Sequence, residues 1–439
     1  FSLTFSFIYS ADLVVMQGGN YSSIQTAITN ANPNDRILIA PGNYSENILI
    51  DKSITLAPLV PNATWNLLGD VSFATDDFSN EVIEIIGGEI ISMNGAWNYQ
   101  GTVTPGVSAT INIINCTIYQ NVDLRSFFLF VNLINSTFNA NVELNGFGHI
   151  SGNKFIGASG YPELNIYNHG INNIDHENAG IIQGNVFHNT KISFGGISTY
   201  YQSNDPYMLP FLKIRNNVFT YDSPYYSYHQ IHAYAHDFEV DLFITNNTFV
   251  RSVQHDFYKF IYINNGTQNI IVKNNIFLDD GSAGTTRFIW PGSSFVDFSY
   301  NLVGYQLIGN DYANSGGGWS SLDVDHIYTN NINSQYYVGD LIPTYIDIDF
   351  SNPSQSTGRV TNFGNIPINA GDPGDEYLNT DGTQNNFGTN GGTHSWSNVV
   401  TNNDASGSKA SIIDVQLPST IYGIPGITFQ IKATSIHEK

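Results

Sequence analysis

The sequence predicts an all-β solenoid, a fold in which short strands wind in successive coils, and three observations support this. Charged residues are only 12% of the chain and aromatic residues are 13%. The polar remainder is rich in Asn, Gly, Ser and Thr, which are poor helix formers and disfavour a helical bundle. A phrase of the form Asn-x-Phe recurs at varying intervals, as expected when a solenoid carries loops of different length.

The chain begins with an apolar run, residues 1–11 (FSLTFSFIYSA), which we interpret as the remnant of a signal peptide or as a first strand. The segment Tyr21–Leu56 then predicts a short helix that caps the solenoid, followed by the first two coils. Ser22 or Ser23 can cap this helix. Three apolar residues share its buried face, namely Ile24, Ala27 and Ile28. Strands are expected at residues 36–40, 48–50 and 54–56.

The recurring phrase predicts two columns of stacked side chains. Its final apolar residue should point inward, so that the rings of successive coils stack. The residue two places earlier should lie at a tight corner, where Asn tolerates left-handed backbone angles. Its amide can donate to one coil and accept from the next. The expected amide column is Cys116, Ser136, Asn153, Asn185, Asn217, Asn247, Asn275 and Asn301. We therefore interpret Cys116 as a structural residue rather than a reactive thiol.

The length of the shortest coils limits the architecture. Successive apolar positions are 20 residues apart from Ile118 to Phe138 and 17 apart from Phe138 to Phe155. A strand–helix–strand unit needs roughly 30 residues or more, so these coils suit three short strands and three turns. A left-handed helix of hexapeptides is disfavoured because no strict six-residue period appears.

Three passages together resemble secreted bacterial proteins with a right-handed parallel β-helix, the pectate-lyase-like architecture. They are Tyr21–Leu56, the Asn-x-Phe series, and the closing segment Ile368–Gly392 (INAGDPGDEYLNTDGTQNNFGTNGG). The resemblance implies that the β-helix occupies residues 12–395. It implies little about function, because this architecture hosts lyases, hydrolases, epimerases, adhesins and spikes.

The composition changes after Ser395. Residues 396–409 are polar and are expected to form a linker. Residues 410–439 contain two apolar strand patterns, 412–417 and 427–431, and resemble the start of an immunoglobulin-like β-sandwich domain. We expect the natural protein to continue beyond this point.

Net charge, cysteine content and hydropathy argue against nucleic-acid binding, membrane binding and internal disulfides. The net charge of -22 opposes binding to nucleic acids and to anionic membranes. The single cysteine excludes an internal disulfide. No internal stretch reaches the ~20 apolar residues that a membrane span needs. The composition therefore favours a secreted or cell-surface protein whose partners are surface glycans or other surface proteins.

Tyrosines and histidines concentrate in one region. Tyr225, Tyr226 and Tyr228 lie in a Pro- and Ser-containing loop. Exposed Tyr rings stack on sugars and hydrogen-bond to their hydroxyl groups, so this loop is a candidate ligand-binding site. Three histidines extend the same candidate site: His229, His232 and His236. The alternative is that the loop folds onto the solenoid and buries its own rings.

The closing segment holds a candidate calcium site. Its proposed oxygen ligands are Asp375, Asn379, Asp381 and Asn385, spaced around a Gly turn. The alternative is that these residues make hydrogen-bonded turns that close the last coil. No other cofactor is expected.

Two function classes stay open, with a third behind them. The main expectation is a non-catalytic extracellular protein that serves in adhesion, in glycan or protein recognition, or as a subunit of a surface assembly. The alternative is a polysaccharide lyase or glycoside hydrolase that acts in a groove along the coils, and the third is a phage-type spike. Catalysis predicts carboxylates and a base clustered on adjacent coils, and the sequence reveals no such cluster beside its Lys and Arg residues.

Overall fold

The computed structural model describes most of the solenoid and parts of the C-terminal region. The described residues are 10–73, 82–95, 109–125, 128–144, 148–157, 163–166, 180–195, 211–222, 229–234, 241–252, 259–264, 269–278, 287–290, 295–304, 329–334, 347–349, 351–356, 369–379, 382–392, 395, 411–416 and 432–436.

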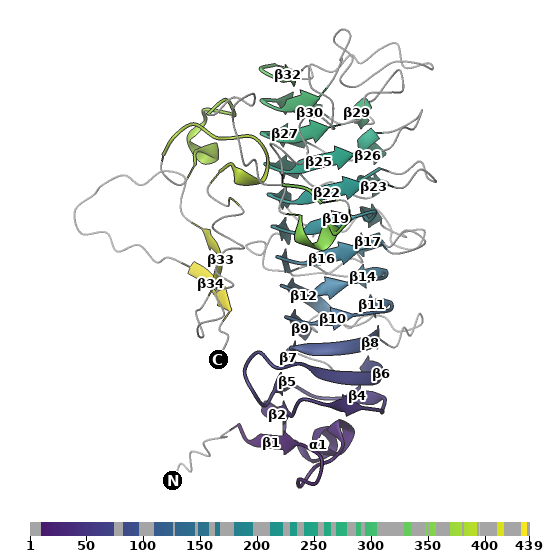
Figure 1. Ribbon diagram of the computed structural model, residues 1–439. Coiled ribbons are helices and arrows are strands. Elements are labelled where there is room, and N and C mark those ends of the chain that lie inside the picture. The colour runs from purple at the N-terminus through teal and green to yellow at the C-terminus, as the bar shows by residue number, and fades with distance from the viewer. Residues whose placement is uncertain are drawn as a thin grey trace, which may run out of the picture.

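Each coil contributes strands to three ladders that run along the molecule, and every pairing within them is parallel (Figure 1). The first ladder is β1 (Asp12–Val15), β2 (Asp35–Ile39), β5 (Ile54–Pro58), β7 (Val82–Ile86), β9 (Ala109–Ile114), β12 (Phe128–Ile134), β15 (His149–Ser151), β18 (Gly180–Gln183), β21 (Phe211–Arg215), β24 (Asp241–Thr245), β27 (Asn269–Lys273) and β30 (Phe295–Ser299).

The other two ladders share the long strands β6 (Trp65–Phe73) and β8 (Gly88–Gly95), which span both of them. The second ladder is β3 (Asn43–Tyr44), β10 (Thr117–Ile118), β13 (Thr137–Phe138), β16 (Lys154–Ile156), β19 (Val186–His188), β22 (Val218–Tyr221), β25 (Thr248–Arg251), β28 (Ile276–Leu278), β31 (Leu302–Gly304) and β32 (Ile332–Ser334). The third ladder is β4 (Ile48–Ile50), β11 (Val122–Leu124), β14 (Val142–Leu144), β17 (Glu163–Ile166), β20 (Lys191–Gly195), β23 (Ile231–Tyr234), β26 (Lys259–Asn264) and β29 (Arg287–Trp290).

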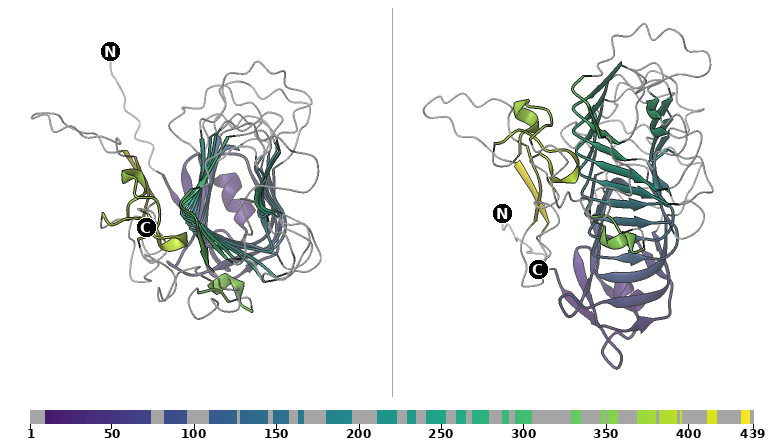
Figure 2. Two further views of the ribbon diagram at one scale, coloured as in Figure 1. Left: turned by 90° about the horizontal axis from the view of Figure 1, so that it is seen from above. Right: turned by 45° about the horizontal axis from the view of Figure 1, so that its top comes forward.

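The arrangement confirms the expected right-handed parallel β-helix. Viewed along its axis, the strands of successive coils superimpose (Figure 2). Inward positions along each strand are Ile, Val, Leu or Phe and are buried, as alternation along a strand requires. The strands keep their register because a slip of one residue would turn every apolar side chain outward.

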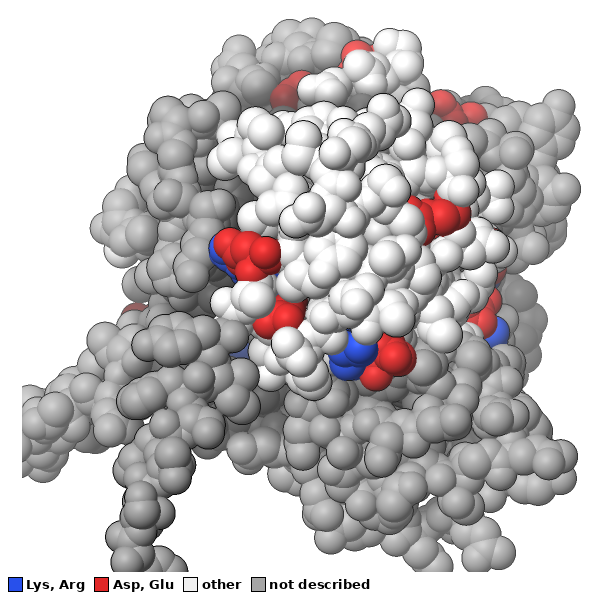
Figure 3. Space-filling model, turned by 90° about the horizontal axis from the view of Figure 1, so that it is seen from below, with Lys and Arg blue, Asp and Glu red and all other residues white. Residues whose placement is uncertain are grey.

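The capping helix is also confirmed. It is α1 (Ile24–Asn30), and the hydroxyl oxygen of its N-cap Ser23 accepts from the Thr26 N–H. Glu46 from the next coil accepts from the first two helical N–H groups, those of Ile24 and Gln25, at 2.8 and 3.0 Å. Seen from this end of the molecule, most of the described surface is uncharged, with small groups of acidic and basic residues on it (Figure 3).

The predicted amide column is present, with one correction. From Asn185 to Asn301, each ladder Asn accepts, through Oδ1, from both the backbone N–H and the side-chain Nδ2 of its counterpart in the preceding coil; for Asn185 and Asn217 the distances are 3.0 and 2.9 Å. The left-handed residue is not the ladder Asn, as the sequence had suggested, but the residue before it, such as Asn216 (φ 54°) and Asn246 (φ 56°). The ladder side chain can then point inward while its predecessor makes the turn.

The predicted ring column stands beside the amides. The stacked rings from neighbouring coils have centroids 4.6–5.1 Å apart: Phe138, Phe155, Phe187, Phe219, Phe249 and Phe277. Cys116 takes an early place in the amide column, and its N–H donates to the Ser136 hydroxyl. Complete burial raises the pKa of its thiol to about 11, which supports a structural role.

The C-terminal region returns along the outside of the coils (Figure 1). It contains three short 3-10 helices: η1 (Pro353–Gln355), η2 (Asp375–Tyr377) and η3 (Gly388–Asn390). Two strands follow, β33 (Ser411–Gln416) and β34 (Lys432–Ile436), and they pair antiparallel. The second lies later than the expected 427–431. Residues 1–9 and the predicted linker 396–409 lie outside the described residues. No helix in the described part of the chain is long and apolar enough to cross a membrane.

Candidate active site

The outer face of the third ladder carries a column of polar side chains, one per coil. Residues at the same outward position pair in register from β11 to β26. They are Asp123, Glu143, Asn165, Ser193, His232 and Tyr262. Their sequence neighbours in the same strands point inward and are buried apolar residues. The β-helix therefore holds these six side chains in a straight row, about 4.8 Å apart per coil.

Arg125 joins two carboxylates at the N-terminal end of this column. Its guanidinium contacts Asp123 in a two-point pair at 2.9 and 2.6 Å and Glu143 of the next coil at 2.8 Å. All three side chains are partly exposed. Burial raises the pKa of the Glu143 carboxyl, with the Arg125 charge opposing the shift and Asp123 and Glu163 adding to it.

A second pair of opposite charges lies in the middle of the third ladder. The Lys191 ammonium on β20 is 2.7 Å from a Glu163 oxygen on β17, and the two residues are in register. The Lys191 side chain is 11% exposed. A fixed ammonium of this kind suits the recognition of an anionic group.

Aromatic and imidazole rings continue the column beyond Lys191. The rings of His229 and Tyr262 stack at 4.5 Å, and the His232 ring stands edge-on to both, at 5.3 and 5.0 Å. Burial, together with the nearby charges of His229 and Lys191, lowers the pKa of His232 to about 3. His232 is therefore a neutral imidazole at physiological pH, which is the form that can accept a proton.

The structure brings together only part of the predicted ligand site. His229 and His232 lie side by side, and their partners are Tyr262 and Lys191, which the sequence analysis had not assigned to a binding site. Tyr225, Tyr226, Tyr228 and His236 lie outside the described residues.

Two of the four predicted calcium residues, Asn379 and Asn385, are engaged in amide contacts. Asn379 donates to the Thr383 hydroxyl and accepts from the Gly392 N–H, while Asn385 exchanges hydrogen bonds with Asn246 of the solenoid. Asp375 begins η2, and Asp381 lies outside the described residues. Among the side chains that the structure describes, no group of three or more His, Cys, Asp or Glu is placed to hold a metal ion. These contacts favour the alternative, a hydrogen-bonded closure.

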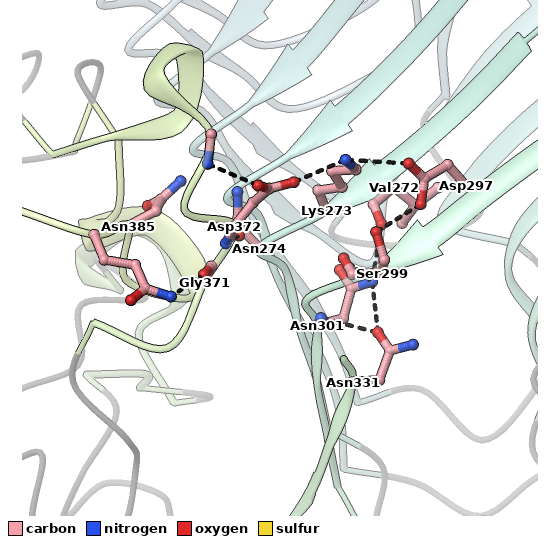
Figure 4. Close-up of polar contacts among 12 residues, drawn as sticks. Val272, Lys273, Asn274, Asp297, Ser299, Asn301, Asn331, Gly371, Asp372 and Asn385 are labelled. Carbon is pink, nitrogen blue, oxygen red and sulfur yellow. Dashed lines mark hydrogen bonds and ion pairs between the residues drawn. The ribbon is translucent and has the colours of Figure 1, made fainter. Parts of the chain in front are cut away.

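Lys273 shows how the closing segment is fastened to the first ladder (Figure 4). Its ammonium lies 2.7 Å from Asp372 in that segment and 3.1 Å from Asp297 on β30. These two carboxylates raise the pKa of Lys273 against the effect of burial. The Asn274 side-chain oxygen accepts from the Asp372 N–H. A lysine held charged in this way serves as an anchor and not as a base.

Comparison with known proteins gives little beyond the fold. The chain matches no model of a known protein family and no curated protein. A solved structure of a PL6 family alginate lyase, in the form of an arginine-to-alanine variant, is similar over 82% of this chain, with 15% identity and a TM-score of 0.32. The chain spans 58% of that lyase chain. So low a score lends no weight to any argument about activity.

The main expectation from the sequence, a non-catalytic surface protein, is wrong. It required the absence of carboxylates and a base on adjacent coils, and the structure places Arg125 beside Glu143 and Lys191 beside Glu163 at 2.8 and 2.7 Å. The findings favour the alternative, an enzyme that acts along the coils.

Proposed function

We propose that the protein is a polysaccharide lyase that cleaves a uronate-containing glycan on the outer face of the third ladder. The observation that carries the proposal is the grouping of the neutral His232 imidazole with Tyr262 and Lys191 on three consecutive coils. A base, a hydroxyl donor and a cation are the three groups that β-elimination from a uronate requires.

Each side chain has a distinct role in this reaction. The Lys191 ammonium neutralises the uronate carboxylate and so acidifies the proton on C5. His232 takes that proton, and the electron pair of the C5–H bond forms the C4–C5 double bond. The C4–O bond then breaks, and the Tyr262 hydroxyl donates a proton to the departing oxygen. The product is one shortened chain and one chain with an unsaturated terminal sugar.

Substrate binding assists the base. In the free protein, Lys191 is one of the charges that lower the pKa of His232. Burial is the largest cause of that low pKa, and a bound uronate carboxylate offsets the smaller contribution of Lys191, which raises the pKa of the imidazole in part. The substrate therefore increases the basicity of the group that attacks it. The negatively charged protein fits a secreted enzyme acting on extracellular glycans, with residues 12–395 as its catalytic solenoid and residues 410–439 as part of a separate β domain.

The test is an ultraviolet assay for unsaturated products on alginate, polygalacturonate and glycosaminoglycans. The wild-type protein is expected to release absorbing products from at least one of them. His232→Ala and Lys191→Met are each expected to lower kcat by at least about 100-fold, as loss of a general base or of charge stabilisation does. His149→Gln, a histidine on the outer face of the first ladder, is the matched control and should keep full activity.

Two outcomes would contradict the proposal. New reducing ends without ultraviolet absorbance would indicate hydrolysis. Full activity in His232→Ala would remove the imidazole from the mechanism, whatever the substrate.

A further inference from the structure

The charge cluster of Asp123, Arg125 and Glu143 has no part in the reaction just described, yet it lies in the same outward column as His232. From Glu143 the column passes Asn165 and Ser193 before it reaches His232. Those three steps between coils correspond to about 14 Å, and a fourth step to Asp123 brings the distance to about 19 Å. The cluster is therefore remote from the reacting atoms but aligned with them.

The cluster is also accessible and suited to sugars. The side chains of Arg125, Asp123 and Glu143 are 17%, 25% and 22% exposed. Carboxylate oxygens accept hydrogen bonds from sugar hydroxyls, and a guanidinium is a planar donor that matches a carboxylate. Between the cluster and His232, the half-buried Asn165 offers a further hydrogen-bonding group in the same row.

Exposure differs between the ladders and along the column: Ser193 and His232 are buried, whereas the cluster at the N-terminal end of the column is partly exposed. On the second ladder, outward residues such as Val218, Thr248 and Ile276 are buried. The closing segment covers that ladder, and a Cβ added at Gly388 would meet Ile276 and Thr248 at 2.6 and 2.7 Å. In the third ladder the cluster keeps part of its surface open to solvent.

We propose that Arg125, with Asp123 and Glu143, forms a distal subsite that binds the same polymer three to four coils away from the cleaved bond, so that the enzyme prefers long chains and cleaves them internally. This inference rests on the proposed lyase function. The alternative is that the cluster only stabilises the contact between two coils. In that case substitution of Arg125 changes the stability of the protein and leaves its chain-length preference unchanged.

The experiment compares a long uronate polymer with its trisaccharide. Arg125→Gln is expected to lower kcat/KM on the polymer by about tenfold, through KM, and to leave kcat/KM on the trisaccharide unchanged, because the short chain does not reach the subsite. Arg125→Lys keeps the charge but loses the two-point geometry and should fall between. Arg36→Gln is the matched control, since Arg36 pairs with Asp12 on the first ladder and lies outside the column.

Binding to the polymer is measured separately in the His232→Ala background, at a temperature at which all variants remain folded. There Arg125→Gln is expected to weaken the affinity for the polymer about tenfold. An equal loss on polymer and trisaccharide, or no loss on either, would overturn the subsite. Polymer binding that depends on Arg125 without any cleavage would overturn the lyase function and leave the subsite standing, and absence of binding and cleavage on every polymer would overturn both.

Discussion

Replacement of Asn247 by alanine tests whether the buried amide column holds the coils together. Asn247 is fully buried, and its Oδ1 accepts from the N–H and the Nδ2 of Asn217 at 2.9 and 3.0 Å. Its Nδ2 donates to the carbonyl of Ile214 at 2.8 Å and to Oδ1 of Asn275 at 3.0 Å. The substitution removes all of these contacts at one level of the solenoid.

The expected cost follows from the groups that are left behind. The Asn217 backbone N–H loses its acceptor in a site closed to water, which costs about 1–3 kcal/mol. The Asn217 amide keeps its bond to Ile182, and Asn275 keeps its bond from the Asn247 N–H, so these partners lose less. With about 1 kcal/mol for the remaining weakened contacts, Asn247→Ala should lower the free energy of unfolding by about 3 kcal/mol.

The chain itself supplies two comparison variants. Ser136 occupies the same column and accepts from the Cys116 N–H at 3.0 Å, so Asn247→Ser should keep an acceptor for Asn217 and lose about half as much stability. Asn269 is exposed, and its side-chain amide donates to Asp241 at the surface, so Asn269→Ala should stay within about 0.5 kcal/mol of wild type.

Urea titration and hydrogen exchange provide the measurements. The midpoint should fall in the order wild type and Asn269→Ala, then Asn247→Ser, then Asn247→Ala. The Asn217 amide proton should exchange faster in Asn247→Ala than in wild type. A loss below about 0.5 kcal/mol in Asn247→Ala, with the Asn217 proton still protected, would refute the view that the column is an energetic unit.

Three further predictions concern other parts of the interior. Phe219 stacks between two rings at 4.8 and 4.6 Å, so Phe219→Ala should cost about 3–5 kcal/mol in urea titrations. Cys116, with a thiol pKa of about 11, should resist iodoacetamide at pH 8 until the protein is unfolded; rapid labelling of the native protein would contradict its burial. His232 has a folded pKa near 3, well below the 6.5 of an unfolded histidine. As the pH falls, the unfolded chain therefore binds a proton at this histidine before the folded protein does. The contribution of His232 to the free energy of unfolding is fully present above about pH 6.5 and falls by up to about 1.4 kcal/mol per pH unit from there to pH 3. His232→Gln should show a shallower loss over that window, and an identical slope would exclude a neutral buried imidazole.

The fold was predictable because its signals are local and repeated. Ser23 and the apolar face of α1 define the cap within one short helix, and the ring and amide columns repeat over successive coils in the middle of the chain. The sequence placed the left-handed corner at the ladder Asn, one residue after its actual position. Asn216 and Asn217 are the same residue type, so composition alone does not separate the left-handed residue from the inward one.

The candidate site was harder to predict because it depends on register across insertions. Asp123 and Glu143 each lie seven residues after their column residues, Cys116 and Ser136, so this pair could have been found by counting. His232 and Tyr262 each lie fifteen residues after Asn217 and Asn247, and this pair could have been found in the same way.

The position of Lys191 beside Glu163 could not be found by counting residues from the amide column. It follows Asn185 by only six residues, whereas Glu163 follows Asn153 by ten, yet the two side chains are in register. The corner between the second and third ladders takes a different number of residues in each coil, so equal offsets from the amide column do not imply adjacency.

Inward side chains stabilise the fold, and outward side chains of the third ladder are exempt from that task. This division allows the outward column from Asp123 to Tyr262 to vary. The amides and rings fix the distance between coils from inside, so an outward side chain of the third ladder contributes little to the choice of fold. The corner insertions can vary without disturbing the core, because each coil regains its register at the next buried strand. The row from Asp123 to Tyr262 can therefore change its chemistry from coil to coil while its spacing stays fixed. A protein that binds a polymer of regularly spaced sugars needs side chains at fixed spacing and with different chemistry at each position.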